Sequence, residues 1–289
     1  RNLELTETLR EKQKKGTLLW VFDKTKTAMG ARLLRTYIEQ PLIDKAAILE
    51  RQDAIEELCE QYINREELRE YLNPIYDLER LMGRISYNTA NPRDLIAFKS
   101  SLAMLPHIKQ ALAGFRSELL KGIYENMDTL DDLYQLIEDA IIEEPPITIR
   151  EGGIIKEGFN DDVDQFRKSK TEGKTWLSDL EIRERERTGI KTLKVKYNKI
   201  FGYCLEVTNS FKDKVPPDYT RRQTLVNAER YTTQELKNLE DMIMGAEDKL
   251  YALEYDLFCA VRDTIAGEVL RIQKSAKAVA QLDVLASLA

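Results

Sequence analysis

The residues of this 289-residue chain that could contact a ligand are concentrated in one basic segment. Between Arg183 and Arg230 lie twelve Lys and Arg residues but only six Asp and Glu residues, which gives this 48-residue stretch a net charge of +6. The whole chain has a net charge of −6, so the remainder carries −12. Basic residues near aromatic ones are typical of surfaces that bind nucleic-acid phosphates, because they displace condensed counterions. Lysines also protect the edges of small exposed sheets, and the composition leaves both interpretations open.

No other group of residues indicates a catalytic or metal centre. Gly173-Lys174-Thr175 resembles the end of a phosphate-binding loop, but residue 168 is Lys where that motif requires Gly. The acidic residues between 128 and 144 lie mostly on the polar side of a predicted helix, so a metal-dependent hydrolase that uses Asp131 or Asp132 is a weak alternative. One His and three scattered Cys residues argue against a structural zinc site and a disulfide framework. We therefore expect no enzymatic activity and no cofactor in this chain.

The elements that position the basic segment are predicted to be mostly helical. Only 13 Gly and 8 Pro residues occur, and Leu, Glu, Lys and Arg are abundant, which favours long helices over a β-sandwich or barrel. Residues 147–155 alternate around Gly152-Gly153 and predict a small hairpin or an extended ribbon. Trp20 and Trp176 are expected in the core or at a helix crossing. The residues expected to cap successive helices in the first half are Thr25 or Thr27, Asp44, and Asn91 followed by Pro92.

The second half of the chain predicts two long helices on either side of an insertion. Apolar residues follow helical spacing from Phe159 to Leu180, and a 3-4 repeat begins after residue 233. Such a repeat is typical of a helix packed lengthwise against another helix. The predicted fold class is therefore mainly α: a multi-helical core with two long antiparallel helices that carry a small antiparallel β-sheet. The repeat consists of Leu236, Leu239, Ile243, Ala246, Leu250, Leu253, Leu257 and Ala260.

Apolar and polar residues alternate with period two inside the insertion. The runs 193–198 and 203–208 are separated by a turn, which predicts a β-hairpin. Tyr219–Val226 is expected to form a third strand, antiparallel to the second strand. That pairing would bring its end beside the hairpin turn and gather basic and amide side chains suited to positioning phosphates. The candidate residues for contact with a DNA backbone are Lys194, Lys196, Asn198, Lys199, Arg222 and Asn227.

Short motifs in a fixed order connect these elements to a known family. They are RNLEL at 1–5, GTLL at 16–19, DKTKTAMGAR at 23–32, NPRDL at 91–95, REGG at 150–153, GFN at 158–160, RERERTG at 183–189 and RRQTLVNAERY at 221–231. Together they cover essentially the whole chain, and they resemble the core domain of the MutS mismatch-repair family. The last motif resembles the bacterial members of the family that possess a DNA clamp.

The resemblance implies an all-α core joined through long lever helices to a β-rich clamp. Residues 1–172 and 234–289 would form the core and levers, and residues 173–233 the clamp. In the family, the clamp arms of a dimer close around duplex DNA and touch its backbone without sequence specificity. The implied partners are double-stranded DNA, bound weakly by one arm, and in the full-length protein a second copy and proteins of the MutL type.

The resemblance also implies an activity for the longer protein. The sequence starts at the motif that opens the core domain and stops before any ATPase domain, so we expect a fragment whose levers transmit ATPase-state changes to the clamp. ATP and magnesium would belong only to the ATPase domain. No apolar run reaches the roughly 18 residues that span a bilayer, and we expect a cytoplasmic, nucleoid-associated bacterial protein without a membrane partner. The alternative function is a helical scaffold whose basic β tip binds an acidic protein.

Overall fold

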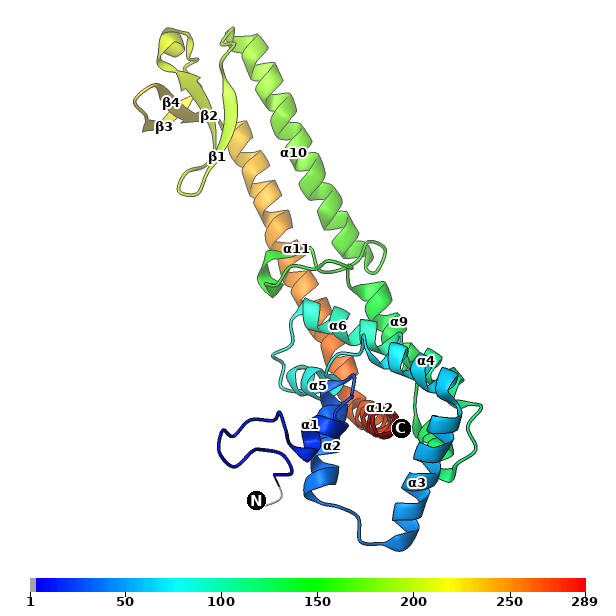
Figure 1. Cartoon of the computed structure of the whole chain (residues 1–289). Helices are drawn as coiled ribbons and strands as arrows, with labels where there is room; N and C mark the ends of the chain where they lie inside the picture. Colours follow the sequence, from blue (N-terminus) through cyan, green and yellow to red (C-terminus); the bar gives the residue numbers. More distant parts are fainter. Residues whose placement is uncertain (1–3) are drawn as a thin grey trace. The chain divides into compact units, whose positions relative to one another are not determined.

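The computed structural model describes residues 4–289, so the first three residues of the motif at 1–5 lie outside the described residues (Figure 1). The chain divides into two compact units. One unit combines the chain up to Ile149 with Leu257–Ala289, and the other is Arg150–Asp256. Of the boundaries expected from the family resemblance, 173 lies inside the long helix α10 (Asp161–Thr188) and 233 directly precedes the long helix α11 (Gln234–Gly267). Both boundaries stay a prediction.

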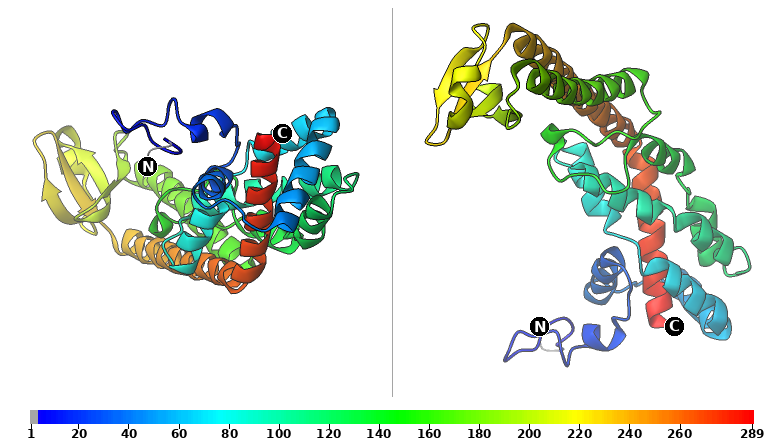
Figure 2. Two further views of the ribbon diagram at one scale, coloured as in Figure 1. Left: turned by 60° about the horizontal axis from the view of Figure 1, so that its bottom comes forward. Right: turned by 90° about the horizontal axis from the view of Figure 1, so that it is seen from above.

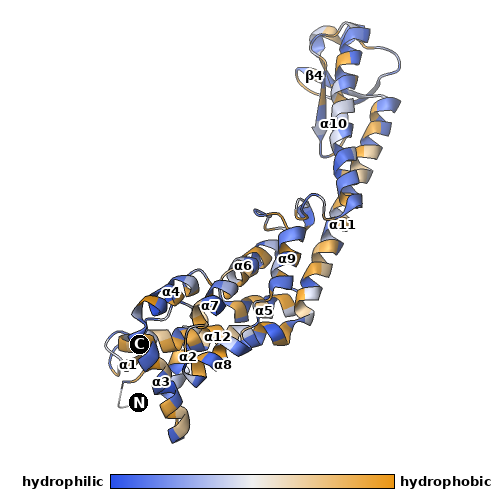
Figure 3. Ribbon diagram, turned by 90° about the vertical axis from the view of Figure 1, so that its right-hand side faces the viewer, coloured by the Kyte–Doolittle hydropathy of each residue, from blue (hydrophilic) through white to orange (hydrophobic). Residues whose placement is uncertain are grey.

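The first unit is built from helices around α12 (Val269–Leu288), which contacts α2, α3, α4, α5 and α8 (Figure 2). Apolar residues recur along these helices (Figure 3), and Val279, Leu282, Val284 and Leu285 of α12 are buried. The other helices of this unit are α1 (Leu18–Phe22), α2 (Ala28–Glu39), α3 (Lys45–Glu60), α4 (Tyr62–Leu72), α5 (Leu78–Ser86), α6 (Pro92–Leu102), α7 (Leu105–Leu112), α8 (Glu118–Asn126) and α9 (Asp131–Ala140).

The predicted helix starts are confirmed by the cap geometry. Thr27 accepts from the N–H of Gly30 and starts α2, and Asp44 accepts from the N–H of Ala47 and starts α3. Asn91 and Asp94 form a reciprocal capping box at α6, with Pro92 at the first helical position. These signals are local in sequence, and each satisfies backbone N–H groups that have no partner inside the helix.

The second unit consists of two long antiparallel helices and a four-stranded antiparallel sheet (Figure 1). The helices are α10 (Asp161–Thr188) and α11 (Gln234–Gly267), whose last residues belong to the first unit. Their contacts run in opposite directions along the two helices, from Lys170 with Glu247 to Arg183 with Glu235. The predicted mainly α class with a small antiparallel sheet is confirmed. The strands are β1 (Lys194–Asn198), β2 (Gly202–Thr208), β3 (Thr220–Thr224) and β4 (Ala228–Thr232), with a 3-10 helix η2 (Asn209–Lys214) between β2 and β3.

The predicted repeat on α11 describes the buried face of that helix only as far as Leu250. Beyond Leu250 the buried positions move to Glu254, Phe258 and Val261, whereas Ala260 is exposed. A straight α-helix has 3.6 residues per turn, so positions seven residues apart rotate gradually around its axis. This rotation accounts for the shift of the buried positions. Residues of α10, the sheet and the first part of α11 share one core, made of Leu177, Leu180, Ile190, Leu193, Leu205, Val207, Tyr219, Tyr231, Leu236 and Ile243.

Two local predictions are wrong. Residues 147–155 form no hairpin: the segment holds the 3-10 helix η1 (Ile149–Glu151), and Gly152 and Gly153 both have a φ of +70°. Only Gly residues adopt that backbone region without strain, so the two glycines redirect the chain instead of closing a two-residue hairpin. Trp20 and Trp176 are also exposed, at 48% and 40% of their surface, and not buried in a core.

Candidate nucleic-acid interface

The strand register of the sheet decides which candidate residues lie together. The order is β1-β2-β4-β3, so β2 pairs with β4 and the expected pairing of the third strand with β2 is wrong. Residues Ala228–Thr232 form an additional strand that takes this place. A tight turn joins β3 to β4, with the N–H of Leu225 donating to the carbonyl of Ala228 at 2.8 Å. Strands joined by so short a turn pair with each other, which leaves β4 as the neighbour of β2.

The hairpin turn and Asn227 consequently lie at opposite ends of the sheet. Asn198 pairs with Gly202 at the start of β2, whereas the residue after Asn227 pairs with Thr208 at the end of β2. The separation along β2 is about 20 Å at roughly 3.3 Å per residue. The predicted cluster therefore does not form between Asn198, Lys199, Arg222 and Asn227.

The outer face of the sheet is polar and carries basic side chains from three strands. Val195, Leu205 and Tyr231 pack into the core, so the residues next to them along each strand point away from it. Burial raises the pKa of the Cys204 thiol on this face, and the charges of Arg230 and Arg222 oppose the shift. Gln223 of β3 pairs with Arg230, and Arg222 lies in the β-bulge between Arg221 and Gln223. The basic residues of the outer face are Lys194, Lys196, Arg222 and Arg230.

A ladder of polar contacts crosses this face through all four strands. The carboxylate of Glu206 lies 2.7 Å from Nζ of Lys196 and 3.2 Å from Nε of Arg230, and Arg230 also donates to Gln223 at 2.8 Å. Burial alone would raise the pKa of Glu206, but the hydrogen bonds from Lys196 and Arg230 outweigh it and lower the pKa. Lys196 and Arg230 therefore share the single negative charge of Glu206, and the three side chains together keep a net charge of +1.

Internal ion pairs divide the twelve basic residues of 183–230 into two groups. Seven pair with carboxylates: Arg183, Arg185, Arg187, Lys196, Lys212, Arg221 and Arg230. Within the described part of the chain the other five make no ion pair, and all are exposed: Lys191, Lys194, Lys199, Lys214 and Arg222. Charges without an internal partner are the ones available to an external phosphate, because a paired cation must first lose its partner.

Three of the six residues predicted to contact a DNA backbone are among these five exposed basic residues. Lys194, Lys199 and Arg222 are exposed and make no ion pair with a described residue. Lys196 is held by Glu206.

The two predicted asparagines shape turns. The side-chain oxygen of Asn198 accepts from the N–H groups of Ile200, at 2.9 Å, and Phe201, at 3.2 Å, and so closes the hairpin turn. Asn227 is exposed in the turn between β3 and β4, and its carbonyl accepts from the N–H of Asn209 at 3.1 Å. Among the described residues, no hydrogen bond joins the side chain of either asparagine to the basic residues of the outer face.

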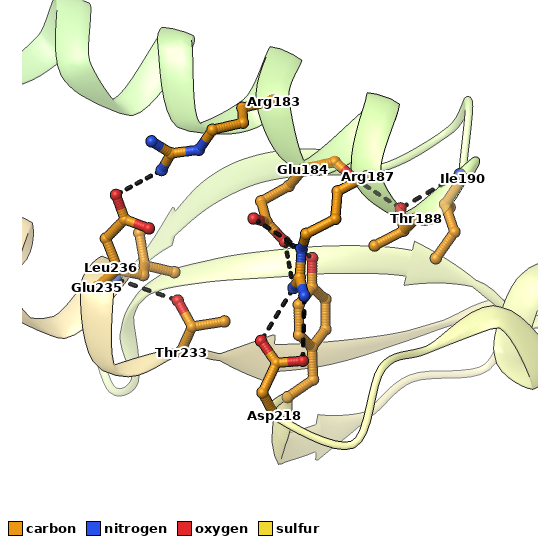
Figure 4. A network of polar contacts seen from close by, with 10 residues as sticks. Arg183, Glu184, Arg187, Thr188, Ile190, Asp218, Thr233, Glu235 and Leu236 are labelled. Carbon is orange, nitrogen blue, oxygen red and sulfur yellow. Dashed lines mark hydrogen bonds and ion pairs between the residues drawn. The ribbon is translucent and has the colours of Figure 1, made fainter.

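The arginines near the end of α10 fasten that helix to the sheet and to α11 (Figure 4). Arg187 lies 2.7 Å from the buried Glu184 and 2.9 Å from Asp218, which precedes β3. Tyr219 donates to the same Glu184 carboxylate at 2.7 Å, and its pKa is raised by burial and by Glu184. Arg183 pairs with Glu235 near the start of α11. Counting charges along the sequence includes these arginines, but two of their partners, Asp218 and Glu235, lie 31 and 52 residues away.

The structure gives structural roles to the residues that resemble catalytic motifs. Gly173 lies inside α10 against Ile243, as expected for a helix crossing and not for a phosphate-binding loop. Asp128 and Asp132 both bind Arg271, with shortest distances of 2.8 and 2.9 Å. Among residues 4–289, no three His, Cys, Asp or Glu side chains are grouped so that they could hold a metal ion.

Comparison with known proteins places this architecture in a family. The family model for MutS domain III matches residues 1–289. The chain belongs to the MutS domain III family. Its similar relatives include proteins named DNA mismatch repair protein MutS from Lachnoclostridium phytofermentans, Ruminiclostridium cellulolyticum and Acetivibrio thermocellus, which are 68%, 54% and 52% identical over 289 residues. The matches cover all of this chain.

This MutS domain III chain corresponds to only part of those relatives. It spans 31% of the Lachnoclostridium protein and 33% of the other two. Across residues 4–289, no helix is both long and apolar enough to cross a membrane.

Proposed function

We propose that this chain is the lever and clamp region of a DNA mismatch-repair protein of the MutS type. Its sheet contacts the backbone of duplex DNA without reading sequence. The observation that carries this proposal is the group of five exposed basic residues, on and around a small sheet, that make no ion pair with a described residue. Phosphate contacts of this kind position a protein on DNA but carry no base information.

The long helices α10 and α11 act in this proposal as stiff levers. Their shared core includes Leu177, Leu180 and Ile243, and each fully buried Leu or Ile contributes on the order of 1.5–3 kcal/mol. Ion pairs between α10 and α11 hold the pair at several points along its length, from Arg167 with Glu254 to Arg183 with Glu235. A rigid pair is suited to carry a change of ATPase state from elsewhere in a longer protein to the sheet.

The partners follow from the same proposal. A second copy of the longer protein supplies the opposite clamp arm, and a MutL-type protein receives the signal in a bacterial cytoplasm near the nucleoid. This chain alone offers one arm and binds duplex DNA weakly.

Duplex binding against salt concentration tests the proposal. Fluorescence anisotropy with two duplexes of unrelated sequence is expected to give equal affinities that fall as salt rises, because each phosphate contact contributes a slope of about −0.9 in log K against log salt. A slope near zero, or a strong preference for one sequence, contradicts backbone contact. If the basic sheet binds an acidic protein instead, duplex DNA will not compete with such a partner.

A further inference from the structure

A cavity of about 370 Å³ lies between the long helices and the β1–β2 hairpin, within the 150–256 unit. Its volume falls within the range of small-ligand pockets, about 300–1,000 Å³. Residues from four elements line it, although they are far apart in sequence: Lys170 and Lys174 of α10, Tyr197 of β1, Tyr203 of β2, and Ile243, Met244 and Glu247 of α11.

Two tyrosines form an aromatic wall of this cavity. The ring centroids of Tyr197 and Tyr203 are 5.1 Å apart and their planes are tilted by 58°. Tyr197 is 53% exposed, so its ring offers a surface that the protein itself does not cover. Met244, which is 40% exposed, adds an apolar and polarisable side chain. A planar ring entering from solvent therefore finds a stacking partner in Tyr197.

The charges around the cavity leave one cation available. Nζ of Lys170 is 2.6 Å from Glu247 and 3.2 Å from the hydroxyl of Tyr251, so Lys170 and Glu247 neutralise each other. Lys174 is exposed and makes no ion pair with a described residue. With Lys170 and Glu247 paired, the lining carries a net positive charge that comes from Lys174.

The nearby acid Glu240 does not line the cavity. It accepts from the backbone N–H of Tyr203 at 3.3 Å and packs against Gly202. Lys174 is therefore the cation of the lining that an anionic group would meet, with Glu240 outside the lining beside Tyr203.

We infer that this cavity binds a nucleotide unit, with its base stacked on Tyr197 and its phosphate at Lys174. An exposed aromatic ring beside an ammonium group is the combination that sequence-independent single-strand binders use. The cavity is distinct from the outer face of the sheet, because Tyr197 and Tyr203 point toward the helices and Lys194 and Lys196 point away from them. The inference goes beyond duplex contact at the outer face. The nucleotide unit comes from single-stranded DNA or from a free nucleotide, and the two sources share this chemistry.

Binding of single-stranded oligo-dT and of thymidine monophosphate to the 289-residue chain tests the inference. Tyr197→Ala and Lys174→Ala are each expected to weaken oligo-dT binding by about tenfold, because one stacked base or one phosphate contact is lost. Tyr197→Phe keeps the ring and is expected to bind as the unchanged chain does. Lys168→Ala on the same helix and Tyr255→Ala on α11 are matched controls, since both residues are exposed and lie outside the cavity.

Each outcome decides between the cavity and other surfaces. If Tyr197→Ala and Lys174→Ala weaken the binding of oligo-dT and of thymidine monophosphate equally, the cavity binds a free nucleotide. If they weaken the binding of oligo-dT alone, the cavity binds single-stranded DNA. Absence of binding, or binding that is unchanged in both Tyr197→Ala and Lys174→Ala, overturns the inference. Arg222→Gln distinguishes the outer face: it is expected to weaken duplex binding and to leave oligo-dT binding unchanged. Loss of oligo-dT binding only in Arg222→Gln would overturn the cavity while leaving the proposed duplex contact in place.

Discussion

Gly173 of α10 faces Ile243 of α11 with no room between them for a methyl group. A Cβ at position 173 would overlap Cγ1 of Ile243 and lie 3.1 Å from its Cδ1. Glycine lowers the stability of a helix interior by about 1 kcal/mol relative to alanine, so its presence within a 28-residue helix has a packing reason. The close approach lets Ile243 join the shared core of the levers, and it distinguishes this Gly-Lys-Thr sequence from a phosphate-binding loop.

The first prediction compares two helical glycines. Gly173→Ala is expected to lower the free energy of unfolding relative to Gly245→Ala by about 1–3 kcal/mol, the typical cost of overpacking a core. Gly245 lies in α11 with nothing within 4 Å of an added Cβ, so its replacement gains helix propensity without a clash. Urea unfolding followed by circular dichroism measures both. The loss in the double variant Gly173→Ala with Ile243→Ala should be smaller than the sum of the losses in the two single variants, because the clash is absent from it. Equal stability of Gly173→Ala and Gly245→Ala would contradict the close contact.

The second prediction concerns a buried carboxylate at the other end of the levers. Glu254 is fully buried, pairs with Arg167 and accepts from the N–H of Gly153 at 2.5 Å. Glu254→Ala is expected to cost about 3 kcal/mol, because Arg167 and the N–H of Gly153 both lose this buried carboxylate. Asp256→Ala is the control, since Asp256 is exposed two residues away and its replacement should change stability by less than about 0.5 kcal/mol. Similar unfolding midpoints for the two variants would contradict this role.

The third prediction is a pH dependence in the helical unit. Hydrogen bonds from Arg271 lower the pKa of both Asp128 and Asp132 below the ordinary value of 3.8, against an opposing effect of burial. A lowered folded-state pKa stabilises the fold above 3.8, and this contribution is lost as pH falls through the folded-state pKa. The stability difference between the unchanged chain and Arg271→Gln should therefore be full near neutral pH and shrink below pH 3.8. Thermal unfolding across pH 2.5–7 measures it, and a pH-independent difference would show that neither aspartate depends on Arg271.

Local signals in the sequence predicted much of the fold. Thr27, Asp44 and Asn91 act on backbone groups only a few residues away, so their capping roles follow from sequence spacing alone. The alternation around the β1–β2 hairpin likewise predicted Leu193, Val195, Leu205 and Val207 as core residues, but Cys204 on the opposite face is also buried. Periodicity identifies which side of an element is apolar, and that information is enough to recognise the long helices and the hairpin.

Contacts between distant residues could not be predicted in the same way. The Ala-Glu-Arg-Tyr-Thr sequence of β4 lacks a strong strand signature, and missing this strand misplaced Asn227 relative to the hairpin turn. Whether a basic residue is available also depends on a distant partner, as Arg187 shows by pairing with Asp218, 31 residues away. Net charge therefore located the basic segment. Only the strand register and the ion pairs of the structure distinguish Lys194, Lys199 and Arg222 from the basic residues that pair with carboxylates.

The contact of the sheet with duplex DNA is tested most directly by matched charge removal. One variant carries Lys194→Gln, Lys199→Gln and Arg222→Gln, which removes three basic residues without an ion-pair partner among the described residues. The control removes three exposed lysines from the long helices and so changes the net charge equally: Lys168→Gln, Lys237→Gln and Lys249→Gln. Duplex affinity is measured for both variants and the unchanged chain over a range of salt concentrations.

The expected result is a selective change in the salt dependence. The variant of the sheet should lose a slope of about 0.9 in log K against log salt for each phosphate contact removed, and the control should keep the slope of the unchanged chain. Equal slopes for the variant of the sheet and the unchanged chain, or an equal loss in the control, would contradict contact between these three residues and the DNA backbone.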